Sequence, residues 1–154
     1  MLTAIIDLGT NTFNLLIADV KDKKFTVVYA GREVVKLGEK SINENRISEA
    51  AFKRGIESFK NLATIINKHK PEIIKAYATS AIREAENGAV FIGELKKLTD
   101  IDVEVISGER EAELIFYGNR LAVNMANEAH LIMDIGGGST EFIIANNETI
   151  FWKQ

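Results

Sequence analysis

Residues 131–145 read LIMDIGGGSTEFIIA and carry the clearest chemical pattern in the chain. Two apolar runs flank an aspartate, three consecutive glycines, two hydroxyl residues and a glutamate. Short apolar runs separated by glycines predict a hairpin of buried strands with an open turn. Glycines leave backbone N–H groups unobstructed, so such a turn can wrap an anion with main-chain amides. The flanking carboxylates, Asp134 and Glu141, could hold a hydrated divalent cation beside that anion.

The same pattern occurs near the N-terminus, where AIIDLGTNT is followed two residues later by LLIA. Asp7 corresponds to Asp134 and Gly9 to Gly136, at a separation of 127 residues (134 − 7). This separation is too long for a solenoid repeat and indicates the opening hairpins of two related lobes. We expect the first copy to have the shorter turn, and we expect Asn14 to interrupt its return strand.

Composition narrows the class of protein. The 154 residues are enough for one sizeable core, and 46% are hydrophobic and 27% charged, as in ordinary globular proteins. The net charge of −3 does not indicate a nucleic-acid-binding protein. No apolar run approaches the roughly 20 residues needed to span a bilayer. Cysteine is absent and the N-terminus lacks a signal-peptide pattern, so we expect a cytoplasmic protein.

Hydrophobic periodicity predicts a mixed α/β chain. Strands are expected at residues 2–8, 13–20, 25–32, 72–78 and 101–106, in a hairpin from 131 to 145, and at 149–152. Helices are expected at about 48–68, 81–86, 89–98 and 109–124. Ser48 is the expected N-cap of the first helix. Three antiparallel strands followed by crossover-linked strands predict a mixed sheet with helices packed on it, the ribonuclease-H-like arrangement.

Four motifs together resemble the exopolyphosphatase and guanosine pentaphosphate phosphohydrolase (Ppx/GppA) family, a branch of the actin-like ATPase superfamily. They are IDLGTNTFNLLI (6–17), ATSAIREAENG (78–88), VISGEREAELIFYG (105–118) and MDIGGGSTEFI (133–143). Catalytic modules of this family resemble one another in having two lobes and about twice the length of this chain. The resemblance therefore implies a first actin-like lobe over residues 1–125 and the opening strands of a truncated second lobe over residues 126–154.

The resemblance implies a hydrolase that releases terminal phosphate from inorganic polyphosphate, converts guanosine pentaphosphate to tetraphosphate, or does both. It also implies water attack assisted by a glutamate, with Mg²⁺ or another divalent cation as cofactor. Polyphosphate or guanosine pentaphosphate is then the expected partner, and neither nucleic acid nor a membrane is. One alternative is an ATP-binding kinase or ATPase of the wider superfamily. Another is an inactive isolated lobe, which could form a homodimer through its unfinished strands.

Hydrolysis of a phosphoanhydride needs donors for the phosphoryl oxygens, an aligned water and a base. The two glycine turns supply the expected phosphate donors, which are Gly9, Thr10, Asn11, Gly136, Gly137, Gly138 and Ser139. The alternative is that these glycines serve turn geometry alone. Arg83 can hold phosphoryl oxygens in a bidentate way, and the family carries an arginine at this position. A salt bridge from Arg83 to Glu84 or Glu86 is the competing interpretation.

Three glutamates, Glu109, Glu111 and Glu113, lie near the start of the helix that Ser107 and Gly108 open. A helix N-terminus favours a charged carboxylate, but this effect does not choose among the three. The family's catalytic glutamate corresponds to Glu111.

The resemblance also gives the carboxylates beside the glycine turns their roles. It links Glu141 to catalysis through water positioning, and Asp134 and Glu141 to the metal. Asp7 is the equivalent residue of the first hairpin and is a third expected metal ligand. The alternative for Asp7 is a side chain that caps its own turn.

Overall fold

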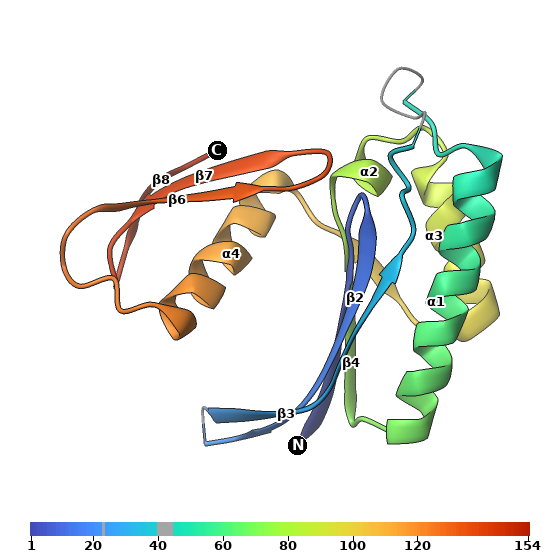
Figure 1. Cartoon of the computed structure of the whole chain (residues 1–154), viewed down its shortest axis with the longest axis horizontal. Coiled ribbons are helices and arrows are strands. Elements are labelled where there is room, and N and C mark those ends of the chain that lie inside the picture. Colours follow the sequence, from blue (N-terminus) through green and yellow to red (C-terminus); the bar gives the residue numbers. More distant parts are fainter. Residues whose placement is uncertain (23, 40–44) are drawn as a thin grey trace. The chain divides into compact units, whose positions relative to one another are not determined.

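The computed structural model describes residues 1–22, 24–39 and 45–154. The chain forms two compact units, Met1–Val105 and Ile106–Gln154 (Figure 1). Helix α4 (Gly108–Ala122) belongs to the second unit, because it packs on the sheet of that unit. Each unit is described by itself.

The first unit contains a five-stranded mixed sheet in the order β3-β2-β1-β4-β5. Its strands are β1 (Leu2–Leu8), β2 (Thr12–Lys21), β3 (Lys24–Val34), β4 (Ile73–Ala78) and β5 (Val103–Val105). β2 pairs antiparallel with both β1 and β3, whereas β4 runs parallel to β1 and β5 parallel to β4. This topology confirms the ribonuclease-H-like, actin-like fold that the sequence predicts.

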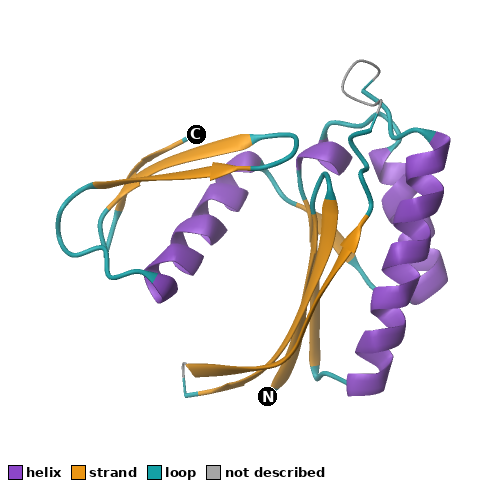
Figure 2. Cartoon of the chain, in the orientation of Figure 1, coloured by secondary structure: helices purple, strands orange, loops and turns teal. Residues whose placement is uncertain are grey.

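Helices α1 (Glu49–His69) and α3 (Gly88–Thr99) cover one face of this sheet (Figure 2). Ser48 is the N-cap of α1, as predicted, and its Oγ accepts a hydrogen bond from the Ala51 amide at 3.3 Å. Lys70 ends the helix in the left-handed conformation, with φ 51°. Pro71 follows and cannot continue the helix.

Short helix α2 (Ser80–Arg83) follows β4 and ends earlier than the predicted span of 81–86. The reason is a competing backbone contact, because the Glu86 amide donates to the Asn45 carbonyl at 2.8 Å. An amide that is bonded elsewhere cannot extend the i to i−4 ladder of the helix.

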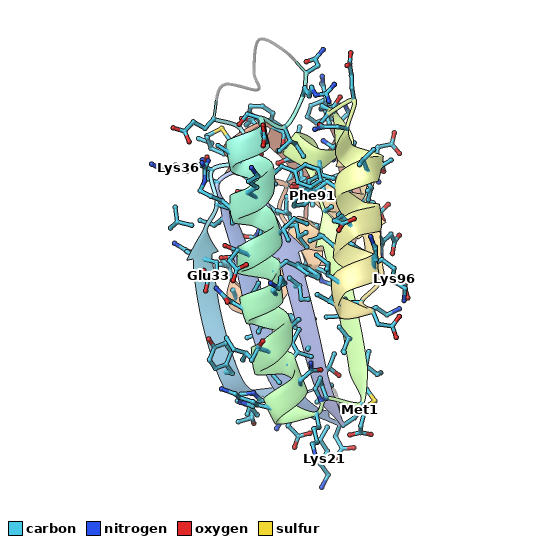
Figure 3. All side chains as sticks on the ribbon, turned by 90° about the vertical axis from the view of Figure 1, so that its right-hand side faces the viewer. Met1, Lys21, Glu33, Lys36, Phe91 and Lys96 are labelled. Atoms are coloured by element: carbon cyan, nitrogen blue, oxygen red, sulfur yellow. The ribbon has the colours of Figure 1, made fainter. Side chains whose placement is uncertain are left out.

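The core of the first unit lies between the sheet and the two long helices. Alternate residues of β1, namely Ala4, Ile6 and Leu8, are fully buried. Phe91 of α3 lies between α1 and α3 (Figure 3), with its ring centroid 4.9 Å from that of Phe52 in an edge-to-face arrangement. A Cβ at Gly55 would lie 2.7 Å from the Phe91 ring, so glycine permits this close approach of the helices.

The second unit is a three-stranded antiparallel sheet, β6-β7-β8, with α4 on one face. The strands are β6 (His130–Ile135), β7 (Thr140–Ala145) and β8 (Ile150–Lys153). The buried residues of this unit's core are Ala112, Phe116, Met125, Ile143 and Ala145. The sequence predicts that both strands of this hairpin are buried. The prediction is wrong for β6, in which Leu131 and Ile135 are 64% and 70% exposed. Across the described ranges, no helix is long and apolar enough to cross a membrane.

Candidate functional site

The two glycine turns have the same length and the same closing hydrogen bond. The Gly9 amide donates to the Thr12 carbonyl at 3.0 Å, and the Gly136 amide donates to the Ser139 carbonyl at 3.0 Å. The expectation of a shorter first turn is therefore wrong. β2 starts at Thr12 and continues through Asn14 without interruption. Asn14 fits the strand because it lies on the sheet face opposite to that of Phe13, which is buried under the helices.

The residues that flank the two turns are also in equivalent registers. Asp7 lies directly opposite Asn14, and Asp134 lies directly opposite Glu141. Asn14 Nδ2 donates to Asp7 Oδ2 at 3.0 Å. In the second hairpin both opposing side chains are carboxylates, and Glu141 is only 4% exposed. The two hairpins thus share one backbone framework but carry different charges at the same position.

The carbonyl groups of the first turn are held by the segment that follows β3. The amides of Val35 and Lys36 donate to the Asn11 carbonyl at 2.9 and 3.0 Å, and the Gly38 amide donates to the Thr10 carbonyl at 3.3 Å. The amides of Thr10 and Asn11 have no acceptor among the described residues. The turn therefore has fixed carbonyls and two N–H groups available for a ligand, as an anion-binding nest requires.

The second turn offers a similar arrangement in the other unit. Gly136 uses its amide to close the turn, whereas the amides of Gly137 and Gly138 have no acceptor in the described part of the chain. Gly136, Gly137 and Gly138 are all exposed. A Cβ at Gly136 would approach the Ser139 carbonyl oxygen to 3.1 Å, so a larger residue would crowd this turn.

Helix α2 begins beside the first turn. Thr10 Oγ1 lies 3.0 Å from Ser80 Oγ, and both side chains are buried. The Thr79 amide also donates to the Leu8 carbonyl at 3.3 Å. Arg83, at the end of α2, donates from Nε to Glu84 Oε1 at 2.9 Å, which is the salt bridge that the sequence left open as an alternative. A phosphate contact by Arg83 stays a prediction.

The three glutamates of α4 differ in exposure and in ion pairing. The Glu113 carboxylate accepts hydrogen bonds from Lys153 Nζ at 2.6 Å and from Arg110 at 2.8 Å. These bonds lower the pKa of Glu113, and the bond from Lys153 has the larger effect. The Glu109 side chain is exposed. Glu111 is half-buried and directly precedes the buried Ala112. Glu113 is thus engaged in ion pairs, and because Glu111 and Glu113 are both half-buried, burial alone does not choose between them.

The first turn of α4 is fixed close to Glu141. Ser107 caps this turn, since its Oγ accepts from the Arg110 amide at 3.2 Å. Lys153 donates to the Glu109 carbonyl at 3.3 Å, and Lys153 lies opposite Ile143 in the β7–β8 pairing. Ile143 is two residues from Glu141 on the same face of β7. The helix start and the carboxylate therefore occupy neighbouring positions within the second unit.

The predicted site residues fall into two groups, one in each unit. The first unit holds Asp7, Gly9, Thr10, Asn11 and Arg83, and the second holds Glu111, Asp134, Gly136, Gly137, Gly138, Ser139 and Glu141. Within the described residues, no group of three or more His, Cys, Asp or Glu side chains is arranged to hold a metal ion. Asp134 and Glu141 form a pair of carboxylates, and further ligands would have to come from water or substrate.

Sequence reasoning missed three residues that contact the predicted ones. Ser80 is the buried partner of Thr10, and Asn14 is the partner of Asp7. Arg32 donates in turn to Asn14 Oδ1 at 3.2 Å, beside an open hollow of about 410 Å³. One signal in the sequence could have identified Asn14, because it lies at the same spacing from Asp7 as Glu141 lies from Asp134.

Comparison with solved structures finds strong similarity over the whole chain. An exopolyphosphatase from Cytophaga hutchinsonii is 44% identical with a TM-score of 0.97, and the match covers 100% of this chain and 49% of that one. The Aquifex aeolicus PPX-GPPA enzyme is 30% identical with a TM-score of 0.88, over 100% of this chain and 51% of that one. The chain thus spans about half the length of these relatives.

Comparison with curated proteins gives a similar result. A bifunctional 3-dehydroquinate synthase/phosphatase from Fusobacterium nucleatum is 37% identical over 158 aligned positions, which cover 97% of this chain and 24% of that protein. The model of the Ppx/GppA phosphatase family matches residues 16–152, which include the second glycine turn and the start of α4. On these matches and the two equivalent hairpins, the chain belongs to the Ppx/GppA phosphatase family.

Proposed function

We propose that the chain provides the phosphate-binding turns and the catalytic base of a phosphohydrolase. One proposed substrate is inorganic polyphosphate, from which the enzyme would release terminal phosphate. The other is guanosine pentaphosphate, which it would convert to tetraphosphate. It would act on either substrate or on both. The observation that carries the proposal is the pair of equivalent hairpins, each with amides that have no acceptor among the described residues. Membership in a phosphatase family and similarity to a protein described as an exopolyphosphatase support the same chemistry.

Binding of the anionic substrate falls to the glycine turns. The amides of Thr10, Asn11, Gly137 and Gly138 present the donors, and the turn that carries Thr10 and Asn11 is held in place before the substrate arrives. Donors that need no reorganisation stabilise the charge that develops on phosphoryl oxygens in the transition state. The side chains of Thr10, Asn11, Ser139 and Thr140 are further proposed donors, and Arg83 is a proposed cationic contact.

Glu111 is the proposed general base. It lies in the first turns of α4, whose N-terminus favours a negative charge. In the proposed step, the Glu111 carboxylate accepts a proton from water as the water oxygen attacks the terminal phosphorus and the bridging P–O bond breaks. The correspondence with the family's catalytic glutamate favours Glu111 over its neighbour Glu113, whose carboxylate is engaged by Lys153 and Arg110.

The residues Asp134 and Glu141 fit a divalent cation such as Mg²⁺. Two carboxylates directly opposite each other on neighbouring strands repel, and a shared cation would offset this repulsion. Glu141 is 4% exposed, and no described residue donates to its carboxylate. Oxygen ligands from one or two carboxylates, completed by water and phosphate, are those that Mg²⁺ prefers. When bound, the cation would neutralise phosphoryl charge, while Glu141 also orients the water.

Phosphate release tests this proposal. The chain is incubated with Mg²⁺ and, separately, with polyphosphate, guanosine pentaphosphate and ATP, and orthophosphate is measured. The Cytophaga hutchinsonii exopolyphosphatase serves as the positive control. It is the longer protein of the two, since this chain spans about half its length. Release from polyphosphate or guanosine pentaphosphate, without turnover of ATP, supports the proposal. Turnover of ATP alone would contradict it and favour a kinase or ATPase.

A further inference from the structure

Asp7, Asn14 and Arg32 form a hydrogen-bonded row across β1, β2 and β3. Asn14 Nδ2 donates to Asp7 Oδ2 at 3.0 Å, and Arg32 Nε donates to Asn14 Oδ1 at 3.2 Å. The strand registers place Asp7 opposite Asn14, and Asn14 opposite Arg32. Residues at opposite positions share a face of the sheet, and all three border the open hollow of the first unit.

The two neighbours of Asn14 fix the orientation of its amide. A guanidinium group has only donors, and an ionised carboxylate has only acceptors. The amide oxygen must therefore face Arg32 and the amide nitrogen must face Asp7. A rotated amide would place N–H₂ against Arg32 and oxygen against Asp7, and both hydrogen bonds would be lost. The side of Asn14 that faces Asp7 thus presents hydrogens instead of a lone pair for a cation.

In the second hairpin, the residue opposite the aspartate is a hydrogen-bond acceptor instead of a donor. Glu141 occupies the register position of Asn14, opposite Asp134, and supplies a second acceptor instead of a donor. Glu141 as a residue is 4% exposed, and its carboxylate receives no hydrogen bond from the described residues. A cation is thus attracted to this pair, whereas the Arg32 guanidinium repels one from the first hairpin.

We propose that Asn14 and Arg32 are positioning residues that hold Asp7 as a cation-free carboxylate. The only divalent cation of the two hairpins then binds at Asp134 and Glu141. This inference rests on the proposed function and removes Asp7 from its set of expected metal ligands. Asp7 instead serves as a fixed hydrogen-bond acceptor beside the first phosphate-binding turn.

Counting Mn²⁺ ions tests the inference without any assay of activity. Bound Mn²⁺ is separated from free Mn²⁺ by electron paramagnetic resonance during titration of the whole chain. The wild type is expected to bind one ion, and Asp7→Asn to bind one ion with a Kd within about twofold of the wild type. Glu141→Gln is expected to bind at least about tenfold more weakly, because loss of an outer partner alone costs a metal site about 10–100-fold.

A conversion variant tests the positioning role itself. The double substitution Asn14→Glu with Arg32→Gln gives the first hairpin the two opposing carboxylates of the second and removes the nearby positive charge. The number of bound Mn²⁺ ions is expected to rise from one to two. A purely structural role for Asn14 and Arg32 would not add an ion. Circular dichroism checks that the variant keeps its fold, and the Asp7→Asn result remains decisive if the fold is lost.

The outcomes distinguish this inference from the proposed function. If the wild type binds one ion and Asp7→Asn loses it, the inference is overturned while a cation-dependent site survives. Two ions in the wild type would also overturn it. If the wild type binds none, the proposed cation site and the inference both fail.

Discussion

The Thr10 hydroxyl contacts the Ser80 hydroxyl at 3.0 Å, and this buried bond joins the first glycine turn to the helix that follows β4. Thr10 also provides the carbonyl that accepts from the Gly38 amide. Three segments that are distant in sequence therefore meet at one turn residue. The turn is held from both sides before any ligand binds, which is what preorganised anion recognition requires.

Thr10→Val should destabilise the first unit by about 1–3 kcal/mol, because it keeps the shape of the side chain but leaves the Ser80 hydroxyl without its buried partner. The measurement is urea unfolding followed by far-UV circular dichroism. Thr64→Val is the matched control, since Thr64 is exposed on α1. A double variant with Ser80→Ala should cost less than the sum of the two single changes. Additive costs would contradict the coupling of the two hydroxyls.

Ser107→Ala should destabilise the second unit by about 1 kcal/mol, because the Arg110 amide loses its capping acceptor at the start of α4. Ser107→Asp should restore most of this stability, since aspartate is an equally good N-cap. Thermal unfolding monitored by fluorescence of Trp152, which lies in β8 of the same unit, provides the readout. Equal stability of Ser107→Ala and the wild type would show that the cap is dispensable.

Glu141→Gln should stabilise the cation-free chain by up to about 1 kcal/mol, because it relieves the repulsion between two carboxylates that lie directly opposite each other. The same change should abolish stabilisation by Mg²⁺, which for the wild type amounts to about 2.7 kcal/mol at 100 times the Kd. Melting temperatures in EDTA and in Mg²⁺ test both parts. Glu148→Gln, in the exposed turn before β8, is the control. If Glu141→Gln responds to Mg²⁺ like the wild type, the cation binds elsewhere.

Acid should weaken the second unit partly through Glu113. Hydrogen bonds from Lys153 and then Arg110 hold the pKa of Glu113 below its ordinary value of 4.5. A carboxyl whose pKa is lower in the folded than in the unfolded state stabilises the fold above the unfolded pKa. That contribution is lost as the pH falls through the folded pKa. Glu113→Gln should therefore be less stable than the wild type at pH 7, with a difference that shrinks from about pH 5 downward. Urea unfolding across this range measures it, and a constant difference would exclude the ion pairs as the cause.

Local signals were enough to predict most elements of the fold. Ser48 and Ser107 each precede an acidic residue in a first helical turn, and both are caps in the structure. The glycine turns were also recognisable, since each follows a short apolar run that ends in aspartate. Features that depend on a few consecutive residues could thus be predicted from the sequence, because hydrophobic periodicity and capping are local.

Contacts between distant segments could not be predicted in this way. Ser80 has its role through Thr10, 70 residues earlier, and Asn14 has its role through Arg32, 18 residues later. A polar residue within an apolar run suggests an interruption, but Asn14 continues the strand on its half-buried face. Leu131 and Ile135 show the converse error, since an apolar strand was expected to be buried and these side chains are exposed.

The function of Glu111 gives the most direct test of the account as a whole. The measurement is the rate of orthophosphate release from polyphosphate in Mg²⁺, for the wild type, Glu111→Gln and the neighbouring control Glu109→Gln. Removal of a general base should lower the rate by about 10²–10⁴-fold in Glu111→Gln. Glu109→Gln should keep a rate close to that of the wild type, because the Glu109 side chain is exposed. Equal rates for Glu111→Gln and the wild type would contradict the proposal that Glu111 is the catalytic base.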